Sequence, residues 1–447
     1  MTVMGGRGSC DPVRTGGLAG AGSGRSSRRG ARVVIWSSDP VTLEEEPAMR
    51  CTPRRRLFAL TLALAAVLAP IAVGPATPVQ AATATGDHTN PCPPDRLGPE
   101  VAARLDRAIE DVRRQAKIPG VVVGLWMPGR GSYVRATGVA DTSTGARMRE
   151  DSFFRIGSET KTFTVTALLE LVDDGLVRLD DPISAYVRGV PRGTEISLRQ
   201  LAEMRSGLFP YSLDKGFAHD LLSDPTRSFT PQQVLAYGYR HRNTFDPGAR
   251  FQYSNSNLVL LGLVVEKVSH MRLADFLRER VLRPAHLHDT LLPHGAEFPA
   301  PHPHGYTDQT LSGATEDATH WNPSWGWAAG AMISNLRDLR SWAVTVATGR
   351  LLSPQTQAQR LTTLPTGFPG TSYGLGIFDS NGWIGHNGSI PGYESVTVYL
   401  PAERATLVIL INTDSSSQGQ EPSTLLARAI TGIVTPDHVY DGSSTTN

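Results

Sequence analysis

The segment FFRIGSETKTFTVTALLELV, residues 153–172, carries the most informative pattern in this sequence. It contains the motif SETK, in which Ser158 and Lys161 supply a hydroxyl and an amine three residues apart. On a helix, side chains at this spacing share a face, with Cβ atoms about 5 to 6 Å apart. The lysine could take the proton of the serine, and the helix N-terminus would favour a developing oxyanion. The pattern indicates an activated serine, although an ordinary N-cap serine would look the same.

A second serine and lysine at the same spacing, Ser212 and Lys215, show that the motif alone is not specific. This second pair lies among Gly207, Pro210 and Gly216, which are typical of a loop. Ser158 is instead followed by the apolar pattern of a buried helix. We therefore predict that Ser158 is the nucleophile.

Composition and charge exclude several classes of protein. Of the 447 residues, 19% are charged and 40% hydrophobic, which is the balance of a soluble globular protein. The 43 basic and 42 acidic residues nearly cancel, so no positive field is available to hold a nucleic-acid backbone. Cys10, Cys51 and Cys92 show no CxxC or metal-ligand spacing. The histidine pairs at 286–288 and 302–304 match no catalytic zinc spacing, so we expect surface loops there and neither a metal nor a cofactor.

The N-terminal region resembles a targeting segment. Basic residues Arg50 and Arg54–Arg56 precede an apolar run at 57–73 and then the small-residue sequence Val79-Gln80-Ala81. This order is typical of a cleaved export signal, so we expect residues 49–81 to be a signal peptide. Residues 1–48 are then a disordered extension or precede the true start at Met49. The product, residues 82–447, is predicted to be secreted, without a stable membrane span.

The rest of the chain has a helix and a hairpin near its beginning and strands and a helix near its end. The predicted elements are a helix at 99–117, strands at 121–126, 132–139, 383–386, 394–400 and 405–411, and a closing helix at 422–433. Between them lie mostly helical segments separated by Pro/Gly loops. We predict an α+β fold in which an antiparallel sheet of about five strands is flanked by helices. The single catalytic unit would comprise an α/β part, at about 97–180 and 320–435, and a helical insertion at about 181–319, with a cleft between them.

Two further motifs follow SETK in the chain. Tyr253-Ser254-Asn255 comes after Pro247-Gly248 and opens a helical pattern, and His386-Asn387-Gly388 lies in a strand-like segment. In this order, the three motifs resemble those of the serine β-lactamase and penicillin-binding protein family. The branch most similar is that of the class C enzymes and the D-alanyl-D-alanine carboxypeptidases, because the second motif is Tyr-x-Asn and the third is Lys or His, any residue, then Gly. Within it the chain resembles the secreted actinobacterial carboxypeptidases, because the third motif begins with histidine.

The resemblance implies a role for each motif residue. Ser158 would attack a carbonyl, Lys161 and Tyr253 would share the proton transfers, and His386 would orient Tyr253 and the leaving group. Substrate would be bound by Asn255, Asn387, Gly388 and Ser389, and the backbone N–H groups of Ser158 and Ser389 would stabilise the oxyanion. The substrate would be a small peptide, such as a peptidoglycan stem, or a β-lactam, and the protein would be a monomer.

The implied activity is that of a D-alanyl-D-alanine carboxypeptidase that forms an acyl-enzyme and also reacts with β-lactams. A class C-like β-lactamase, a carboxylesterase and a non-catalytic penicillin sensor remain alternatives. Two departures from that branch bear on the choice. In the branch, a hydroxyl residue and an arginine hold the substrate carboxylate, whereas this sequence has Asn387 in the first position and no arginine at residues 377–379. Binding of a free carboxylate would be weak unless Arg337 or Arg340 reaches the cleft or His386 carries the charge.

Overall fold

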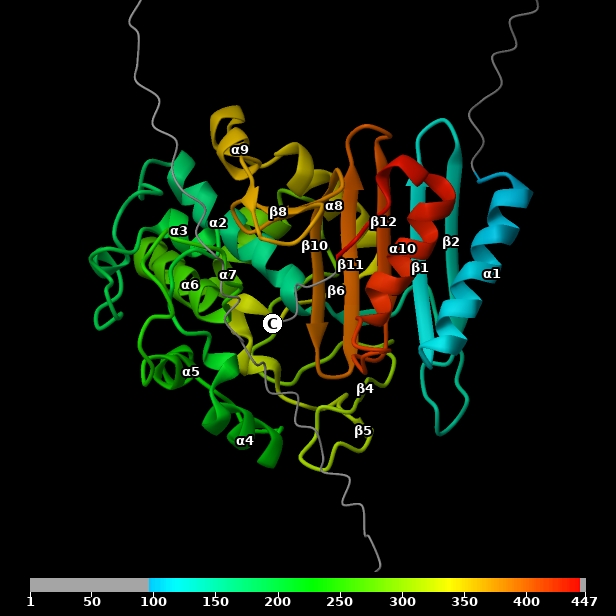
Figure 1. The fold of residues 1–447 in the computed structure, drawn as a ribbon, viewed down its shortest axis with the longest axis horizontal. Helices are drawn as coiled ribbons and strands as arrows, with labels where there is room; N and C mark the ends of the chain where they lie inside the picture. Colours follow the sequence, from blue (N-terminus) through cyan, green and yellow to red (C-terminus); the bar gives the residue numbers. More distant parts are fainter. Residues whose placement is uncertain (1–95, 443–447) are drawn as a thin grey trace, which may run out of the picture.

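The fold is known from a computed structural model, which describes residues 96–442. Its centre is an antiparallel sheet with helices on both faces and a largely helical region beside strand β10 (Figure 1). The predicted extension at 1–48 and signal peptide at 49–81 lie outside the described residues. Within residues 96–442, no helix combines the length and the apolar character needed to cross a membrane.

The main sheet has eight strands in the order β2-β1-β12-β11-β10-β9-β8-β7. The five long strands correspond to those predicted from the sequence, and they are β1 (Gly120–Met127), β2 (Gly131–Gly138), β10 (Trp383–Ile390), β11 (Tyr393–Leu400) and β12 (Ala405–Ile411). β1 pairs with β12, with Val121 opposite Ile411, so the two ends of the unit share one sheet. The α+β class predicted from the sequence is therefore confirmed.

The predicted number of about five strands was wrong, because three short strands extend the sheet beyond β10. They are β7 (Leu364–Pro365), β8 (Thr371–Tyr373) and β9 (Phe378–Ser380). Two or three residues are too few to show an alternating pattern, so periodicity could not reveal them. Two small separate sheets pair β3 (Phe153–Arg155) with β6 (Ile333–Asn335) and β4 (Tyr306–Thr307) with β5 (Glu316–Asp317).

Both faces of the central strands are buried. Val121 and Val123 pack in one core with α1 (Pro99–Gln115) and α10 (Pro422–Val434), whereas Val122 belongs to the larger core on the other face. Successive side chains of a strand point to opposite faces, so the continuous apolar run of β1 serves both cores. α8 (Leu336–Thr348) covers the second face.

α2 (Thr160–Asp173) begins directly after the 3₁₀ turn η1 (Gly157–Glu159) and is buried on nearly all sides. A helix buried all round must satisfy its polar side chains internally. Thr164 does so by donating to the Ala328 carbonyl at 2.7 Å, and Thr162 accepts from Trp342 Nε1 at 2.8 Å. This packing fixes the position of the SETK motif at the start of α2.

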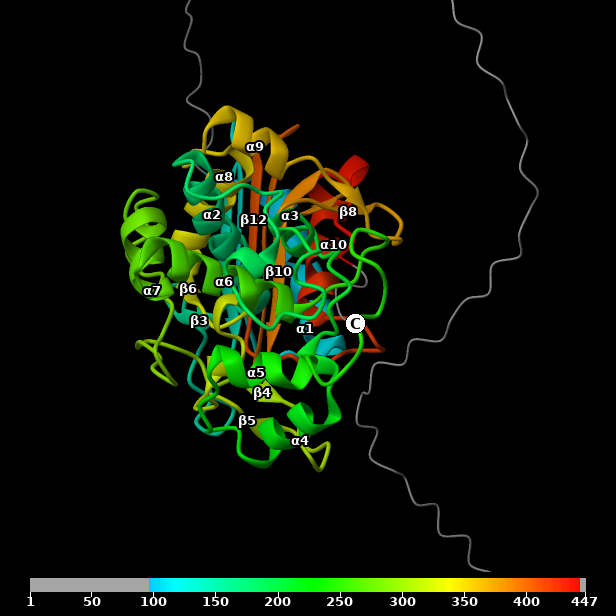
Figure 2. The ribbon, with the colours of Figure 1, turned by 90° about the vertical axis from the view of Figure 1, so that its left-hand side faces the viewer.

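The helical region beside β10 contains five α-helices. Their bounds are α3 (Leu198–Ala202), α4 (Lys215–Ser223), α5 (Pro231–Gly238), α6 (Asn255–Ser269) and α7 (Leu273–Phe276), and a π-helix continues α7 through Leu277–Leu282. The remaining helix, α9 (Pro354–Arg360), precedes β7. Figure 2 views the molecule from this helical side. α6 packs against α2, which brings the YSN motif at the start of α6 to the nucleophile helix.

Candidate active site

Ser158 and Lys161 lie together, as their spacing predicted. Ser158 is in the turn η1, and Lys161 is in the first turn of α2. The amine Nζ of Lys161 lies 2.7 Å from Ser158 Oγ and donates to the Ala329 carbonyl, also at 2.7 Å. The N-cap position of α2 is occupied by Glu159, so Ser158 is not an ordinary N-cap. The competing Lys215 is exposed at the start of α4.

The environment of Lys161 favours the neutral amine. The side chain is fully buried, and burial lowers the pKa of Lys161 well below its usual value. A buried ammonium is disfavoured because it loses its hydration. A neutral amine has a lone pair, which can accept the proton of the Ser158 hydroxyl 2.7 Å away. The pair can therefore act as a base and a nucleophile at neutral pH.

Tyr253 lies against this pair, just before α6. Lys161 Nζ is 4.7 Å from the centre of the Tyr253 ring, and the Ser158 hydroxyl interacts with the phenol. Burial, together with the nearby Glu421 carboxylate, raises the pKa of Tyr253, so the phenol keeps its proton. A protonated phenol in contact with the nucleophile can pass a proton to a departing group.

Asn255 is the first residue of α6, two residues after Tyr253, and its side chain is half-buried. Asn257 fixes the start of α6, because its side chain accepts a hydrogen bond from Ser206 Oγ at 2.7 Å and donates one to the Leu201 carbonyl at 3.1 Å. Both contacts tie α6 to the region of α3. Asn255 is thereby held two residues from Tyr253, at the start of α6.

His386 lies on β10 and is almost fully buried. Its Nε2 is 3.3 Å from the Tyr373 hydroxyl, and its Nδ1 is 2.5 Å from the Asn387 carbonyl. The ring centres of His386 and Tyr253 are 6.1 Å apart, and the hydroxyl within reach of the His386 ring is that of Tyr373. Burial, with the nearby Lys161, lowers the pKa of His386 to about 3, and the ring is neutral at pH 7. Sequence reasoning did not single out Tyr373, which lies 13 residues before His386 on the short strand β8.

Gly388 and Ser389 bring β10 against the nucleophile turn. A Cβ atom on Gly388 would lie 2.0 Å from the Ile156 carbonyl oxygen, and one on Gly157 would lie 2.7 Å from the Ser389 nitrogen. These distances leave no space for a side chain at either glycine. The backbone nitrogen of Ser389 therefore lies against Gly157, the residue before Ser158, so the N–H groups proposed to stabilise the oxyanion come from neighbouring segments.

Asn387 forms a hydrogen bond with Glu421, a residue that sequence analysis did not single out. Its Nδ2 donates to Oε2 of Glu421 at 2.8 Å, and Glu421 is the residue before α10. The two arginines considered for a carboxylate site are elsewhere, because Arg337 pairs with Asp289 at 2.5 Å and Arg340 stacks on the Trp126 ring at 4.6 Å. With His386 neutral, none of these three residues supplies a positive charge to the site.

Glu159, inside the SETK motif, is a third residue that sequence reasoning missed. Its side chain is almost fully buried and faces Ser395 and Thr397 of β11. Burial raises the pKa of Glu159 to about 8, so the acid is mostly protonated at pH 7. The SETK motif indicates the positions of its serine and lysine, but it does not indicate where the side chain of Glu159 between them points.

The histidine pair at 302–304, considered for metal binding, is held by other protein groups. His302 Nδ1 is 2.8 Å from the Pro299 carbonyl, and His304 pairs with Asp317 at 2.6 Å. Among residues 96–442, no group of three or more His, Cys, Asp or Glu side chains is arranged to hold a metal ion.

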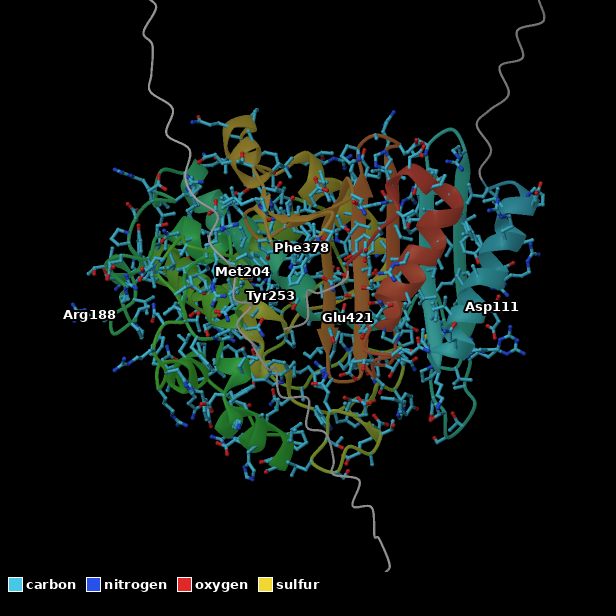
Figure 3. All side chains as sticks on the ribbon, in the orientation of Figure 1. Asp111, Arg188, Met204, Tyr253, Phe378 and Glu421 are labelled. Atoms are coloured by element: carbon cyan, nitrogen blue, oxygen red, sulfur yellow. The ribbon has the colours of Figure 1, made fainter. Side chains whose placement is uncertain are left out.

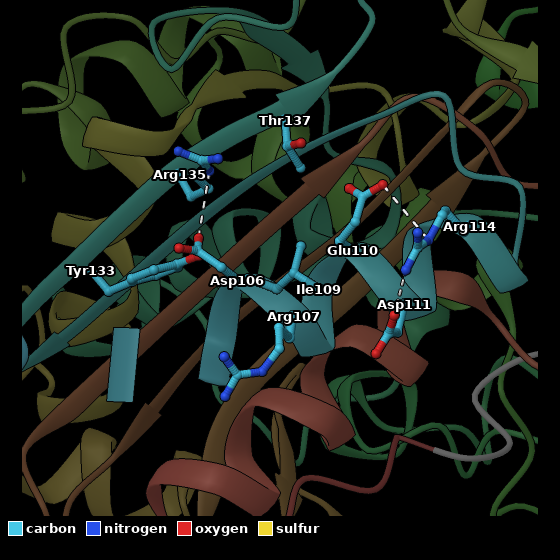
Figure 4. Close-up of a pocket in the computed structure, with 9 residues that line it drawn as sticks. All are labelled: Asp106, Arg107, Ile109, Glu110, Asp111, Arg114, Tyr133, Arg135 and Thr137. Atoms are coloured by element: carbon cyan, nitrogen blue, oxygen red, sulfur yellow. Dashed lines mark hydrogen bonds and ion pairs between the residues drawn. The ribbon is translucent and has the colours of Figure 1, made fainter. Parts of the chain in front are cut away.

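A hollow lined by charged residues lies between α1 and β2 (Figure 4). Its residues interact with one another, since Tyr133 donates to Asp106 at 2.7 Å and Arg135 lies 3.6 Å from the same carboxylate. It is at the β2 edge of the sheet, with β1, β12 and β11 between it and β10. It contains neither serine nor lysine, so the chemistry of this protein is assigned to the Ser158 site.

Comparison with known proteins agrees with this geometry. The model of the family described as Beta-lactamase matches residues 105–430. A solved structure, the D-stereospecific amidohydrolase from a Streptomyces species, superposes with a TM-score of 0.67 and 29% identity, covering 75% of this chain and 99% of that one.

Two relatives show what activities occur among similar sequences. The D-aminopeptidase of Brucella anthropi is 28% identical over 320 residues, which are 69% of this chain and 59% of that protein. The esterase EstB of Burkholderia gladioli is 34% identical over 200 residues, 42% of this chain and 51% of that protein. The chain thus matches between half and two thirds of the length of these relatives. Because the family model covers most of the sequence, the chain belongs to the Beta-lactamase family of serine hydrolases.

Proposed function

We propose that this serine hydrolase cleaves amide bonds of D-amino acid substrates through an acyl-enzyme formed on Ser158. The contact that carries the proposal is the 2.7 Å approach of the buried Lys161 amine to the Ser158 hydroxyl. Two relatives support the substrate class, since one is named a D-aminopeptidase and the other a D-stereospecific amidohydrolase.

In acylation, Ser158 Oγ attacks the substrate carbonyl while its proton moves to Lys161 Nζ. The backbone N–H groups of Ser158 and Ser389 stabilise the oxyanion. Tyr253 then protonates the leaving nitrogen and recovers a proton from the Lys161 ammonium as the C–N bond breaks. Water attacks the resulting ester, its proton passes to the same basic groups, and Ser158 leaves with a proton. Atoms and protons balance over the cycle, with no cofactor.

The finer activity predicted from the sequence, D-alanyl-D-alanine carboxypeptidase, is ranked below amide hydrolysis. It requires a site for a free carboxylate, and a desolvated carboxylate without a charge partner is costly. Arg337 and Arg340 are held elsewhere, and His386 is neutral. An esterase activity is the second candidate, favoured by the similarity to EstB.

The test is a steady-state comparison of kcat/KM for D-phenylalanine amide, its L-enantiomer, a D-Ala-D-Ala peptide, p-nitrophenyl acetate and a chromogenic cephalosporin. We expect the D-amide to be preferred to its L-enantiomer by at least about tenfold, a difference of about 1.4 kcal/mol in transition-state binding. Equal rates on the two enantiomers, or turnover of the acetate alone, would establish the esterase instead. Fastest turnover of the D-Ala-D-Ala peptide would restore the carboxypeptidase.

A further inference from the structure

Glu421 places a carboxylate beside the catalytic strand. Its Oε2 accepts from Asn387 Nδ2 at 2.8 Å, and Asn387 lies between His386 and Gly388 on β10. Figure 3 shows Glu421 and Tyr253 near the centre of the molecule, and the charge of Glu421 acts on the Tyr253 phenol. The Glu421 side chain is only half-buried. It is thus close to the proposed proton donor and partly accessible.

The charge of Glu421 is not neutralised by a neighbouring cation. Over residues 96–442, no lysine, arginine or histidine forms an ion pair with Glu421, and Arg428, the arginine of α10, pairs with Asp441 at 2.6 Å. The neighbours of Glu421 are Asn387, the Thr424 hydroxyl at 3.5 Å and a second acid, Glu394. Burial raises the pKa of Glu421 to about 7, and the hydrogen bond from Asn387 opposes this shift, so the side chain is mostly ionised above that pH. Above about pH 7, Glu421 therefore carries a negative charge that no described cation neutralises, and this charge lies next to Asn387, where the family resemblance places a hydroxyl residue that holds a substrate carboxylate.

We propose that Glu421 selects substrates by charge, disfavouring a leaving group that carries a carboxylate and favouring one that is neutral or cationic. The leaving group is the relevant part of the substrate because Tyr253, its proton donor in the proposed mechanism, lies within the field of Glu421. Two like charges brought together in a partly desolvated cleft repel strongly. The inference deepens the proposed function and rests on it.

The experiment compares two dipeptides that differ only in the charge of the leaving group, D-Ala-D-Ala and D-Ala-D-Ala amide. At pH 8, above the raised pKa of about 7 of Glu421, we expect the wild-type enzyme to prefer the amide by about tenfold or more in kcat/KM. Glu421→Gln keeps an acceptor for Asn387 and removes the charge, so the preference should fall by about fivefold or more, with the free acid gaining relative to the amide. Glu403→Gln removes an exposed carboxylate from the turn between β11 and β12 and should leave the preference unchanged.

A second pair of substrates separates failure of this inference from failure of the proposed function. p-Nitrophenyl acetate and 3-carboxy-4-nitrophenyl acetate share an acyl group and differ by one carboxylate on the leaving group. If neither dipeptide is cleaved but the esters are, the D-amide proposal fails, and charge selection is still decided by the effect of Glu421→Gln on the ester ratio. If Glu421→Gln does not fold, two other measurements decide whether Glu421 selects by charge. One is the effect of Glu421→Ala on the ratio of kcat/KM within each substrate pair, and the other is that ratio for the wild-type enzyme at low and high salt, because salt weakens repulsion. An unchanged ratio, or an equal loss on both members of a pair, overturns the proposal and leaves Glu421 only a structural partner of Asn387.

Discussion

His386 Nε2 lies 3.3 Å from the hydroxyl of Tyr373, and this contact joins the HNG motif to the short strand β8. Tyr373 in turn packs edge-on against Phe378, with ring centres 4.4 Å apart. The histidine is therefore held by an aromatic group that neither neighbours it in sequence nor belongs to a recognised motif.

Tyr373→Phe should keep this packing and remove only the hydroxyl. We expect kcat/KM to fall by about tenfold because His386 loses the partner that orients its ring. The free energy of unfolding should fall by about 1 kcal/mol, the scale of one hydrogen bond. Steady-state kinetics and denaturant unfolding check the two effects. A loss of stability of several kcal/mol with kcat/KM unchanged would show that Tyr373 serves the core alone.

Ser158→Ala should abolish covalent labelling by a fluorescent penicillin, because it removes the oxygen that would form the acyl bond. Ser212→Ala is the matched control, since it changes the other serine found three residues before a lysine. Labelling followed on a denaturing gel reads out both variants. A labelled band that persists without Ser158 is incompatible with the mechanism.

Lys161→Ala and Tyr253→Phe should each reduce acylation by about a hundredfold or more, the usual scale for a lost acid or base. The wild-type rate should rise with pH as Lys161 loses its proton and should reach its plateau well below pH 10.5, because burial lowers the pKa of Lys161. Lys215→Ala removes an exposed lysine and should leave this profile unchanged. Stopped-flow acylation from pH 5 to pH 10 provides the measurement, and addition of a metal chelator should not alter it.

Glu159→Gln should change how stability depends on pH. The pKa of Glu159 is raised to about 8 in the folded protein, whereas an unfolded glutamate titrates near 4.3. The contribution of Glu159 to the free energy of unfolding is therefore fully present below about pH 4. It is lost as the pH rises to about 8, by up to roughly 1.4 kcal/mol per pH unit. The glutamine variant should lack this decline in urea unfolding from pH 5 to pH 8. Parallel curves for the two proteins would show that Glu159 is ionised in the folded state.

Export of the protein is a further prediction. Cleavage after Ala81 should give a secreted product with an N-terminus near Ala82, because the apolar run at 57–73 is followed by a small-residue site. Mass spectrometry of the culture supernatant checks this. A secreted product that still contains residues 57–73 would contradict it.

Patterns local in sequence predicted the parts of the molecule that depend on local structure. The long strands have enough residues to show apolar runs, and SETK places its two functional groups on one helical turn. Contacts made across the sheet could not be read in this way. Asn387 contacts Glu421, which is 34 residues later in the chain, and Arg337 and Arg340 are held by Asp289 and by the Trp126 ring. These contacts depend on how elements cross, which no local pattern encodes.

The absence of room for a side chain at Gly157 and Gly388 limits how this enzyme can diversify. Any residue larger than glycine at these positions would push the nucleophile turn away from β10, so mutation there cannot adjust activity gradually. New substrate preferences must instead arise from residues that surround the turn, such as Asn387 and Glu421, whose replacement leaves the backbone in place. Directed evolution should therefore find adaptive changes in the walls of the cleft while the two glycines stay fixed.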